Sequence, residues 1–193
     1  MNQVLLERAK AGDAEAQFEV GKQCDGDQEK QKDAYRWFLK AAEQGHTDAQ
    51  FAVGLLLNLG DGVKRDDELA VYWFLKAAKT GLADAQFNLG LMFYIGEGTA
   101  QDFEQALRWF REAAAQGHGK AQFNLGVMYT NSEGVKGDSI EAAKWWTLAA
   151  MQGHPAAQSL LESVQQELTA EEMRIVQEST ADWYSKQALR DDS

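Results

Sequence analysis

Three histidines are the side chains in this sequence best suited to bind a metal ion or to act as a general base. Each directly follows a glycine: His46, His118 and His154. They share one phase of a repeated pattern, so we expect them to lie about one repeat or more apart rather than around a single ion. No cysteine or carboxylate cluster accompanies them at ligand spacing. We interpret them as turn residues and predict no metal site and no cofactor.

Four tryptophans also recur, at a spacing of 36 residues: Trp37, Trp73, Trp109 and Trp145. An aromatic ladder of this kind could stack against a ligand. Large aromatic side chains at helical spacing belong more often to a core, where they bury a large apolar area. We therefore assign the tryptophans to the packing between helices.

Cys24 is the only cysteine of the chain, so no internal disulfide can form. This usage fits a reducing compartment, and we expect a cytoplasmic protein, with a periplasmic location possible only if a signal peptide has been removed. Cys24 occupies the phase held by Leu57, Phe93 and Tyr129 in later copies of the pattern. Burial between helices is therefore expected for its thiol.

The pattern consists of two alternating blocks. The first block, Gly-x-x-x-Ala-Gln-Phe-x-x-Gly, starts at Gly12, Gly45, Gly81, Gly117 and, in altered form, at Gly153, with separations of 33, 36, 36 and 36 residues. The second block lies between these copies and starts at Ala34, Ala70, Ala106 and Ala142. Two alternating blocks indicate a repeat unit of two elements.

Each block has the apolar spacing of an amphipathic helix. In the third copy of the first block, Ala85, Leu89, Met92 and Phe93 stand at i, i+4, i+7 and i+8. Neither helix can bury its apolar stripe alone. The first helix of a unit (helix A) must therefore pack on the second (helix B), and helix B on the next helix A, which predicts an all-α array.

Small and acidic residues recur at positions that suit this arrangement. Helix A carries a glycine at one internal position: Gly21, Gly54, Gly90 and Gly126. Glycine there costs about 1 kcal/mol relative to alanine, which implies that a neighbouring helix approaches closely. An aspartate precedes each later helix B at one offset: Asp66, Asp102 and Asp138. We predict that these carboxylates cap helices rather than catalyse a reaction.

The two blocks resemble the Sel-one-like repeat (SLR) family, a branch of the tetratricopeptide-like helical hairpins, over about residues 12 to 160. The resemblance implies a right-handed α-solenoid (an α/α superhelix) that serves protein interaction, often as an adaptor or scaffold in bacteria. On this basis residues 1–168 form the array, with four full repeats from about Gly12, Gly45, Gly81 and Gly117 and a partial fifth from Gly153. Residues 169–193 are expected to form a C-terminal capping helix and an acidic tail.

Two departures from the pattern affect the ends of the array. The first copy has Lys30 at the position of the capping aspartate, so its helix B should start irregularly. After the last repeat, Thr169 to Glu172 form a capping-box sequence that opens a helix. The apolar side chains Met173, Val176, Trp183 and Tyr184 would give this helix a face that closes the array.

The family resemblance places the candidate binding surface on the exposed face of helix A, which would form a concave wall. The candidate residues are Phe51, Asn58, Asp84, Phe87, Asn88, Leu91, Tyr94, Lys120, Phe123, Asn124 and Asn131. Phenylalanines there would act as apolar anchors, and asparagines would hydrogen-bond the backbone of a partner. The hairpin tips remain an alternative binding surface.

The charge of the chain limits the class of partner. A formal net charge of -11 argues against nucleic acid and anionic lipid, which need clustered Lys and Arg. No window is apolar enough for membrane insertion. We expect a monomer that binds a protein or peptide, and the acidic charge makes a partner with a basic surface one candidate.

Two other functions stay open. The chain could be a dedicated inhibitor, such as an immunity protein that neutralises a toxin. An enzyme is the weaker alternative, because no nucleophile, base and orienting group converge in the expected array.

Overall fold

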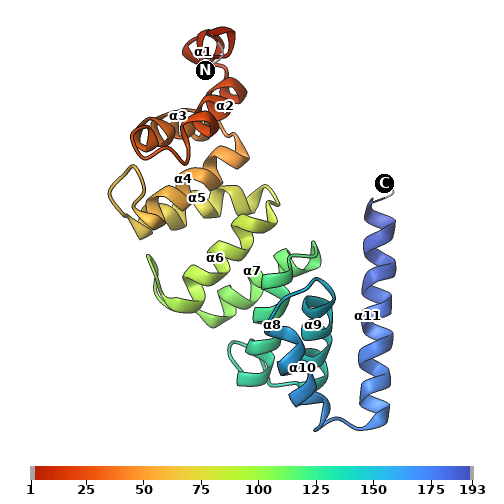
Figure 1. Cartoon of the computed structure of the whole chain (residues 1–193). Helices are drawn as coiled ribbons and strands as arrows, with labels where there is room; N and C mark the ends of the chain where they lie inside the picture. Colours follow the sequence, from red (N-terminus) through yellow and green to blue (C-terminus); the bar gives the residue numbers. More distant parts are fainter. Residues whose placement is uncertain (1–2, 192–193) are drawn as a thin grey trace. The chain divides into compact units, whose positions relative to one another are not determined.

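The computed structural model describes residues 3–191, and every regular element in that range is an α-helix (Figure 1). The all-α prediction is therefore confirmed. The chain divides into two compact units, residues 1–101 and residues 102–193, and each is described by itself. None of the described helices combines the length and the apolar content needed to cross a bilayer.

The first unit contains six helices among its described residues. They are α1 (Gln3–Lys10), α2 (Ala14–Cys24), α3 (Gln31–Glu43), α4 (Thr47–Leu59), α5 (Asp67–Lys79) and α6 (Ala83–Ile95). Within this unit, each of the helices α1 to α5 packs against the helix that follows it. Helices α2, α4 and α6 are the A helices, and α3 and α5 are the B helices.

The second unit continues the alternation. Its helices are α7 (Phe103–Ala115), α8 (Gly119–Asn131), α9 (Ser139–Met151), α10 (Ala157–Gln165) and α11 (Ala170–Asp191). Helix α8 packs against α7 and α9, and α9 also contacts α10 and α11. The A helix α8 thus lies between two B helices, as the nearest-neighbour packing of a repeat array requires.

The core consists of the apolar stripes that the repeats predict. Phe74 and Phe110 are fully buried, and the paired alanines near the ends of α3, α5 and α7 are buried as well. Trp73, Trp109 and Trp145 are buried, whereas Trp37 is half-buried. Cys24 is buried too, and this burial raises the pKa of its thiol.

The glycines inside helix A sit where an aromatic ring of helix B approaches. A Cβ atom added at Gly126 would lie 2.3 Å from Nε1 of Trp146, and one at Gly54 would lie 2.7 Å from the Phe74 ring. These distances are shorter than any van der Waals contact, so only glycine permits the observed approach. The prediction of close helix contact is confirmed at these positions.

The caps follow the sequence closely. Asp66, Asp102 and Asp138 each accept a hydrogen bond from a backbone N–H in the first turn of the following helix, which confirms their assignment. Lys30 makes no side-chain cap at the start of α3, in line with the irregular start predicted there. His46 was predicted to be a turn residue, and the structure gives it a more specific role. Its Nδ1 atom accepts a hydrogen bond from the Ala49 N–H at 3.3 Å, so its side chain caps α4.

A ladder of buried glutamines was not predicted. Each A helix of the four repeats carries one at the same position: Gln17, Gln50, Gln86 and Gln122. Their Nε2 atoms donate to the carbonyl oxygens of Ala9, Ala42, Ala78 and Ala114, respectively, at 3.0 to 3.3 Å. Each A helix is thereby tied to the carboxyl end of the helix before it, where carbonyl groups lack helical partners.

The C-terminal helix begins with the predicted capping box. Glu172 accepts from the Thr169 N–H at 2.8 Å, and Thr169 accepts from the Glu172 N–H at 3.3 Å. Helix α11 packs on α9, where Val176 and Thr180 are buried. Met173, Trp183 and Tyr184 are half-buried, and α11 continues to Asp191, so the described part of the expected tail is helical.

Candidate functional site

Two apolar rows run along the A helices of the first unit. Phe51, Leu55 and Leu59 stand at i, i+4 and i+8 on α4, and Phe87, Leu91 and Ile95 stand at the same positions on α6. Both helices pack against α5. We call these two sets of three residues the apolar rows.

The exposure of the apolar rows increases toward the carboxyl end of each helix. Phe87 is only 8% exposed, whereas Leu55 and Leu91 are half-buried. Leu59 and Ile95, the last residues of α4 and α6, are 70% and 61% exposed. The sequence did not single out Leu59 and Ile95. The signal that could have found them is an apolar residue directly before the glycine that ends the helix.

The predicted aromatic anchors are partly used for packing. The Phe51 ring lies 5.8 Å from the Phe74 ring, and the Phe123 ring stacks on His154 with 4.1 Å between centroids. Phe51 and Phe123 are half-buried, and Phe87 is buried. Of the three, Phe87 therefore has the least surface to offer a partner.

The predicted asparagines have partners within the chain. Asn58 donates to Asp67 at 3.0 Å, and Asn88 donates to the backbone oxygen of Asp84 at 2.8 Å. The same is true of Asn131, which donates to Glu133 at 3.3 Å. The fourth asparagine, Asn124, is half-buried. Hydrogen bonding of a partner backbone by these amides stays a prediction.

The remaining candidate positions differ in charge between copies. Asp84 and Lys120 are both exposed, at the amino ends of α6 and α8. At the equivalent position of α2, Glu15 contacts Nε2 of His46 at 3.1 Å. The pKa of His154 is lowered by burial of its ring and, to a smaller extent, by the charge of Lys120. In these repeats, the charged side chain in the first turn of helix A (Glu15 in α2, Lys120 in α8) therefore lies near the histidine of the next repeat.

Tyr94 lies half-buried near the end of α6, and its backbone oxygen accepts a hydrogen bond from Gln101 at 2.9 Å. No group of three or more His, Cys, Asp or Glu side chains among the described residues is arranged to hold a metal ion. Leu59 and Ile95 are the large apolar side chains of the A helices in the first unit that are mostly exposed.

Comparison with known proteins identifies the repeats. The model of the Sel1 repeat matches residues 14–46, 47–82, 83–118 and 119–154. Two solved structures of bacterial proteins align with most of the chain. The first is a protective antigen of uropathogenic Escherichia coli that displays an SLR fold, with a TM-score of 0.82, 36% identity, and coverage of 98% of this chain and 41% of the antigen chain.

The second is a Sel1 repeat protein from Oxalobacter formigenes, with a TM-score of 0.75, 31% identity, and coverage of 93% of this chain and 74% of that one. No protein with a curated description matches the chain. The chain spans 41% of the length of the E. coli antigen. With four matched repeats and a related structure aligned over most of both chains, the protein belongs to the Sel1 repeat family.

Proposed function

We propose that this protein is a non-catalytic protein-interaction module whose apolar rows on α4 and α6 bind an apolar segment of a partner protein. Sel1 repeat proteins are generally protein-interaction modules and non-catalytic scaffolds. The observation that carries the proposal is the exposure of Leu59 and Ile95 at the same position of consecutive A helices.

The apolar rows suit a partner because removing exposed apolar area from water stabilises the complex that covers it. Burial of such area contributes about 25 cal/mol per Å² before the costs of association. Exposed apolar residues scattered singly need no explanation, but Leu59 and Ile95 recur at one position and continue into half-buried leucines, which supports an interaction site on these helices. The half-buried Leu55 and Leu91 extend each row toward the core.

Acidic side chains at the other end of the same helices favour a partner that combines apolar and basic groups. Asp48 and Asp84 are exposed in the first turns of α4 and α6. A basic side chain next to the apolar segment of the partner would meet these carboxylates and orient the complex.

The test replaces the two most exposed residues by the one that the fourth repeat carries. Asn131 occupies this position in α8, so the double variant Leu59→Asn with Ile95→Asn is compatible with the fold. We expect the variant to lose partner proteins that the immobilised wild-type chain captures from the native host lysate. Its thermal unfolding should be nearly unchanged, since both side chains are exposed.

Met151→Asn is the matched control, because Met151 is 63% exposed and lies on α9, outside the apolar rows. It should retain the partners. Equal capture by the wild type and the double variant would rule out the apolar rows as the binding surface. Phe87→Ala is a poorer test, because the buried ring supports the core.

A second candidate function is that of an inhibitor that neutralises a basic toxin or effector, which the net charge of -11 favours. Binding through acidic groups would weaken steeply with salt and would survive the Leu59→Asn, Ile95→Asn change. The same capture experiment at two salt concentrations therefore distinguishes the two functions.

A further inference from the structure

An open cavity of about 670 Å³ lies in the second unit, on helices other than those that carry the apolar rows. Helix α7 contributes Arg111, helix α8 contributes Tyr129, and helix α9 contributes Glu141 and Trp145. The turn between α8 and α9, residues 135–138, forms the remaining wall. A volume of this size is typical of sites that hold a small organic molecule or a side chain of a partner.

The end of the third repeat and the first helix of the fourth differ from the equivalent places earlier in the array at this cavity. Arg111 stands where helices α3 and α5 carry Leu39 and Leu75, and Tyr129 stands at the position of Leu57 and Phe93 on α4 and α6. An apolar pair of the earlier repeats is thus replaced by a polar one. Because apolar residues satisfy the fold at these positions, the replacement is not required for packing.

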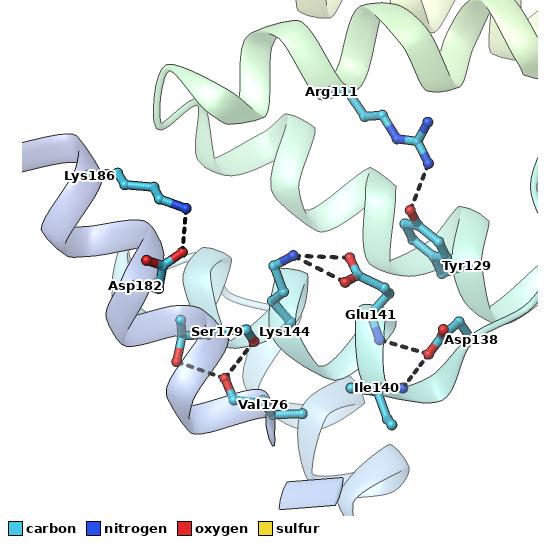
Figure 2. A network of polar contacts seen from close by, with 11 residues as sticks. Arg111, Tyr129, Asp138, Ile140, Glu141, Lys144, Val176, Ser179, Asp182 and Lys186 are labelled. Atoms are coloured by element: carbon cyan, nitrogen blue, oxygen red, sulfur yellow. Dashed lines mark hydrogen bonds and ion pairs between the residues drawn. The ribbon is translucent and has the colours of Figure 1, made fainter. Parts of the chain in front are cut away.

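The two substituted side chains are joined by a hydrogen bond. The Arg111 guanidinium donates to the Tyr129 hydroxyl at 2.7 Å, and Figure 2 shows Arg111 reaching from α7 toward this hydroxyl. Tyr129 is only 8% exposed, so it holds the guanidinium from a fixed position. One of the five N–H donors of Arg111 is used in this way, and the others stay available to an acceptor.

The carboxylates of the cavity have donors of their own. Asp138 accepts from the backbone N–H groups of Ile140 and Glu141 at 3.0 Å, at the amino end of α9. Glu141 contacts Nζ of Lys144 at 3.1 and 3.2 Å (Figure 2). These contacts offset the negative charge that the two carboxylates bring to the cavity.

The cations of the cavity are not paired in this way. Within the described part of the chain, Arg111 and Lys136 have no carboxylate oxygen within 4.0 Å of their charged nitrogens. A guanidinium presents a planar set of donors that matches a carboxylate. Tyr129, Val135 and Trp145 supply the apolar surface beside these cations.

We propose that this cavity binds a carboxylate carried on an aromatic or aliphatic stem, with Arg111 and Lys136 holding the carboxylate and Tyr129 and Trp145 contacting the stem. The site does not depend on the apolar rows, since it lies on other helices. The carboxylate can belong to a small acid or to a partner polypeptide, and both sources use the same contacts.

The test uses 3-phenylpropionate as the probe and 3-phenylpropionamide as the neutral analogue. Both are titrated into the protein of residues 1–193 while the indole N–H signal of Trp145 is followed by NMR. The signal is assigned by its loss in Trp145→Phe. We expect saturable shifts with the acid and at least tenfold weaker binding of the amide.

Arg111→Leu and Tyr129→Phe introduce the residues of earlier repeats, so both variants should fold. The Arg111→Leu variant should bind the acid at least tenfold more weakly, and Lys136→Gln tests the second cation independently. Arg108→Leu is the matched control, because Arg108 lies on the same helix over the Trp109 ring, outside the cavity. It should change the affinity less than twofold.

Peptides then identify the source of the carboxylate. Displacement of the probe by a peptide with a free C-terminal phenylalanine, but not by its amide, would support a chain terminus. Displacement by a peptide with an internal glutamate would support a side chain, and failure of all peptides would support a small acid. Equal binding of acid and amide, or equal losses in Arg111→Leu and Arg108→Leu, would overturn the proposal.

Discussion

At the scale of single residues, the glutamine ladder contains one incomplete member. Side-chain oxygens of Gln17 and Gln122 accept from Gln44 and Gln152 at 2.7 and 2.6 Å, at the end of the following helix B. The second repeat carries Thr80 at that position, and its hydroxyl donates to the Ala77 carbonyl instead. The Oε1 atom of Gln50 is therefore buried without a hydrogen-bond partner.

We predict that Thr80→Gln stabilises the protein. The longer amide should reach Gln50 as Gln44 reaches Gln17, and satisfying a buried acceptor is worth about 1 kcal/mol. The free energy of unfolding, measured by urea denaturation, should rise by about that amount. Thr80→Ala removes the hydroxyl without adding a donor and should give no gain. A Thr80→Gln variant no more stable than the wild type would contradict this explanation.

At the scale of the helix pair, the contact between α8 and α9 depends on Gly126. A Cβ atom there would meet Nε1 and Cδ1 of Trp146 at 2.3 and 2.5 Å. The ring cannot move away easily, because it is 3% exposed and its N–H donates to the Phe123 carbonyl at 3.2 Å. Separation of the two helices is the remaining way to accommodate a methyl group.

We predict that Gly126→Ala destabilises the fold despite the better helix propensity of alanine. Overpacking of this kind costs about 1–3 kcal/mol. The gain in helix propensity is about 1 kcal/mol, so we expect a net loss of stability of up to about 2 kcal/mol. Differential scanning calorimetry should show a lower melting temperature. Gly119→Ala is the control on the same helix, since its Cβ would lie 3.5 Å from the nearest atom. It should leave the melting temperature unchanged or raise it.

The helices, turns and caps could be predicted from the sequence because each repeat presents the same local signal several times. Asp66 and Gly126 are examples, since a cap or a close contact follows from position within the unit. Exposure could not be predicted in the same way. Phe51 and Phe87 share one position, yet only Phe87 is buried, because exposure depends on the surrounding side chains.

Three further features could not be predicted from the repeats. The glutamine ladder was missed because a polar residue within an apolar block gives no sign of burial until its carbonyl partner is placed in space. Helix α11 has a capping box that fixes its start, but its packing on α9 depends on a tertiary contact that no repeat contains. The cavity beside Arg111 likewise became visible only when α7, α8 and α9 were in place.

At the scale of the whole molecule, the excess of negative charge is not compensated by ion pairs. The chain carries 30 acidic and 19 basic side chains. Most described ion pairs join exposed side chains three or four residues apart, such as Arg174 with Glu171 and Glu178. Exposed pairs of this kind contribute little to stability. Repulsion among the remaining carboxylates therefore disfavours the compact state more than the expanded one.

We predict that added NaCl raises the melting temperature at pH 7. The Debye length falls from about 30 Å at 0.01 M to about 10 Å at 0.1 M, which screens repulsion between distant carboxylates more than contacts within pairs. For a chain of this size, a gain of about 1 kcal/mol corresponds to roughly 2–4 °C. The control is the same change of salt near pH 4.7, the isoelectric point, where the effect should be much smaller. A melting temperature that falls with salt at pH 7 would mean that the ion pairs outweigh the repulsion. Salt should have the opposite effect on association with a basic partner, because the carboxylates that repel one another in the folded chain attract that partner.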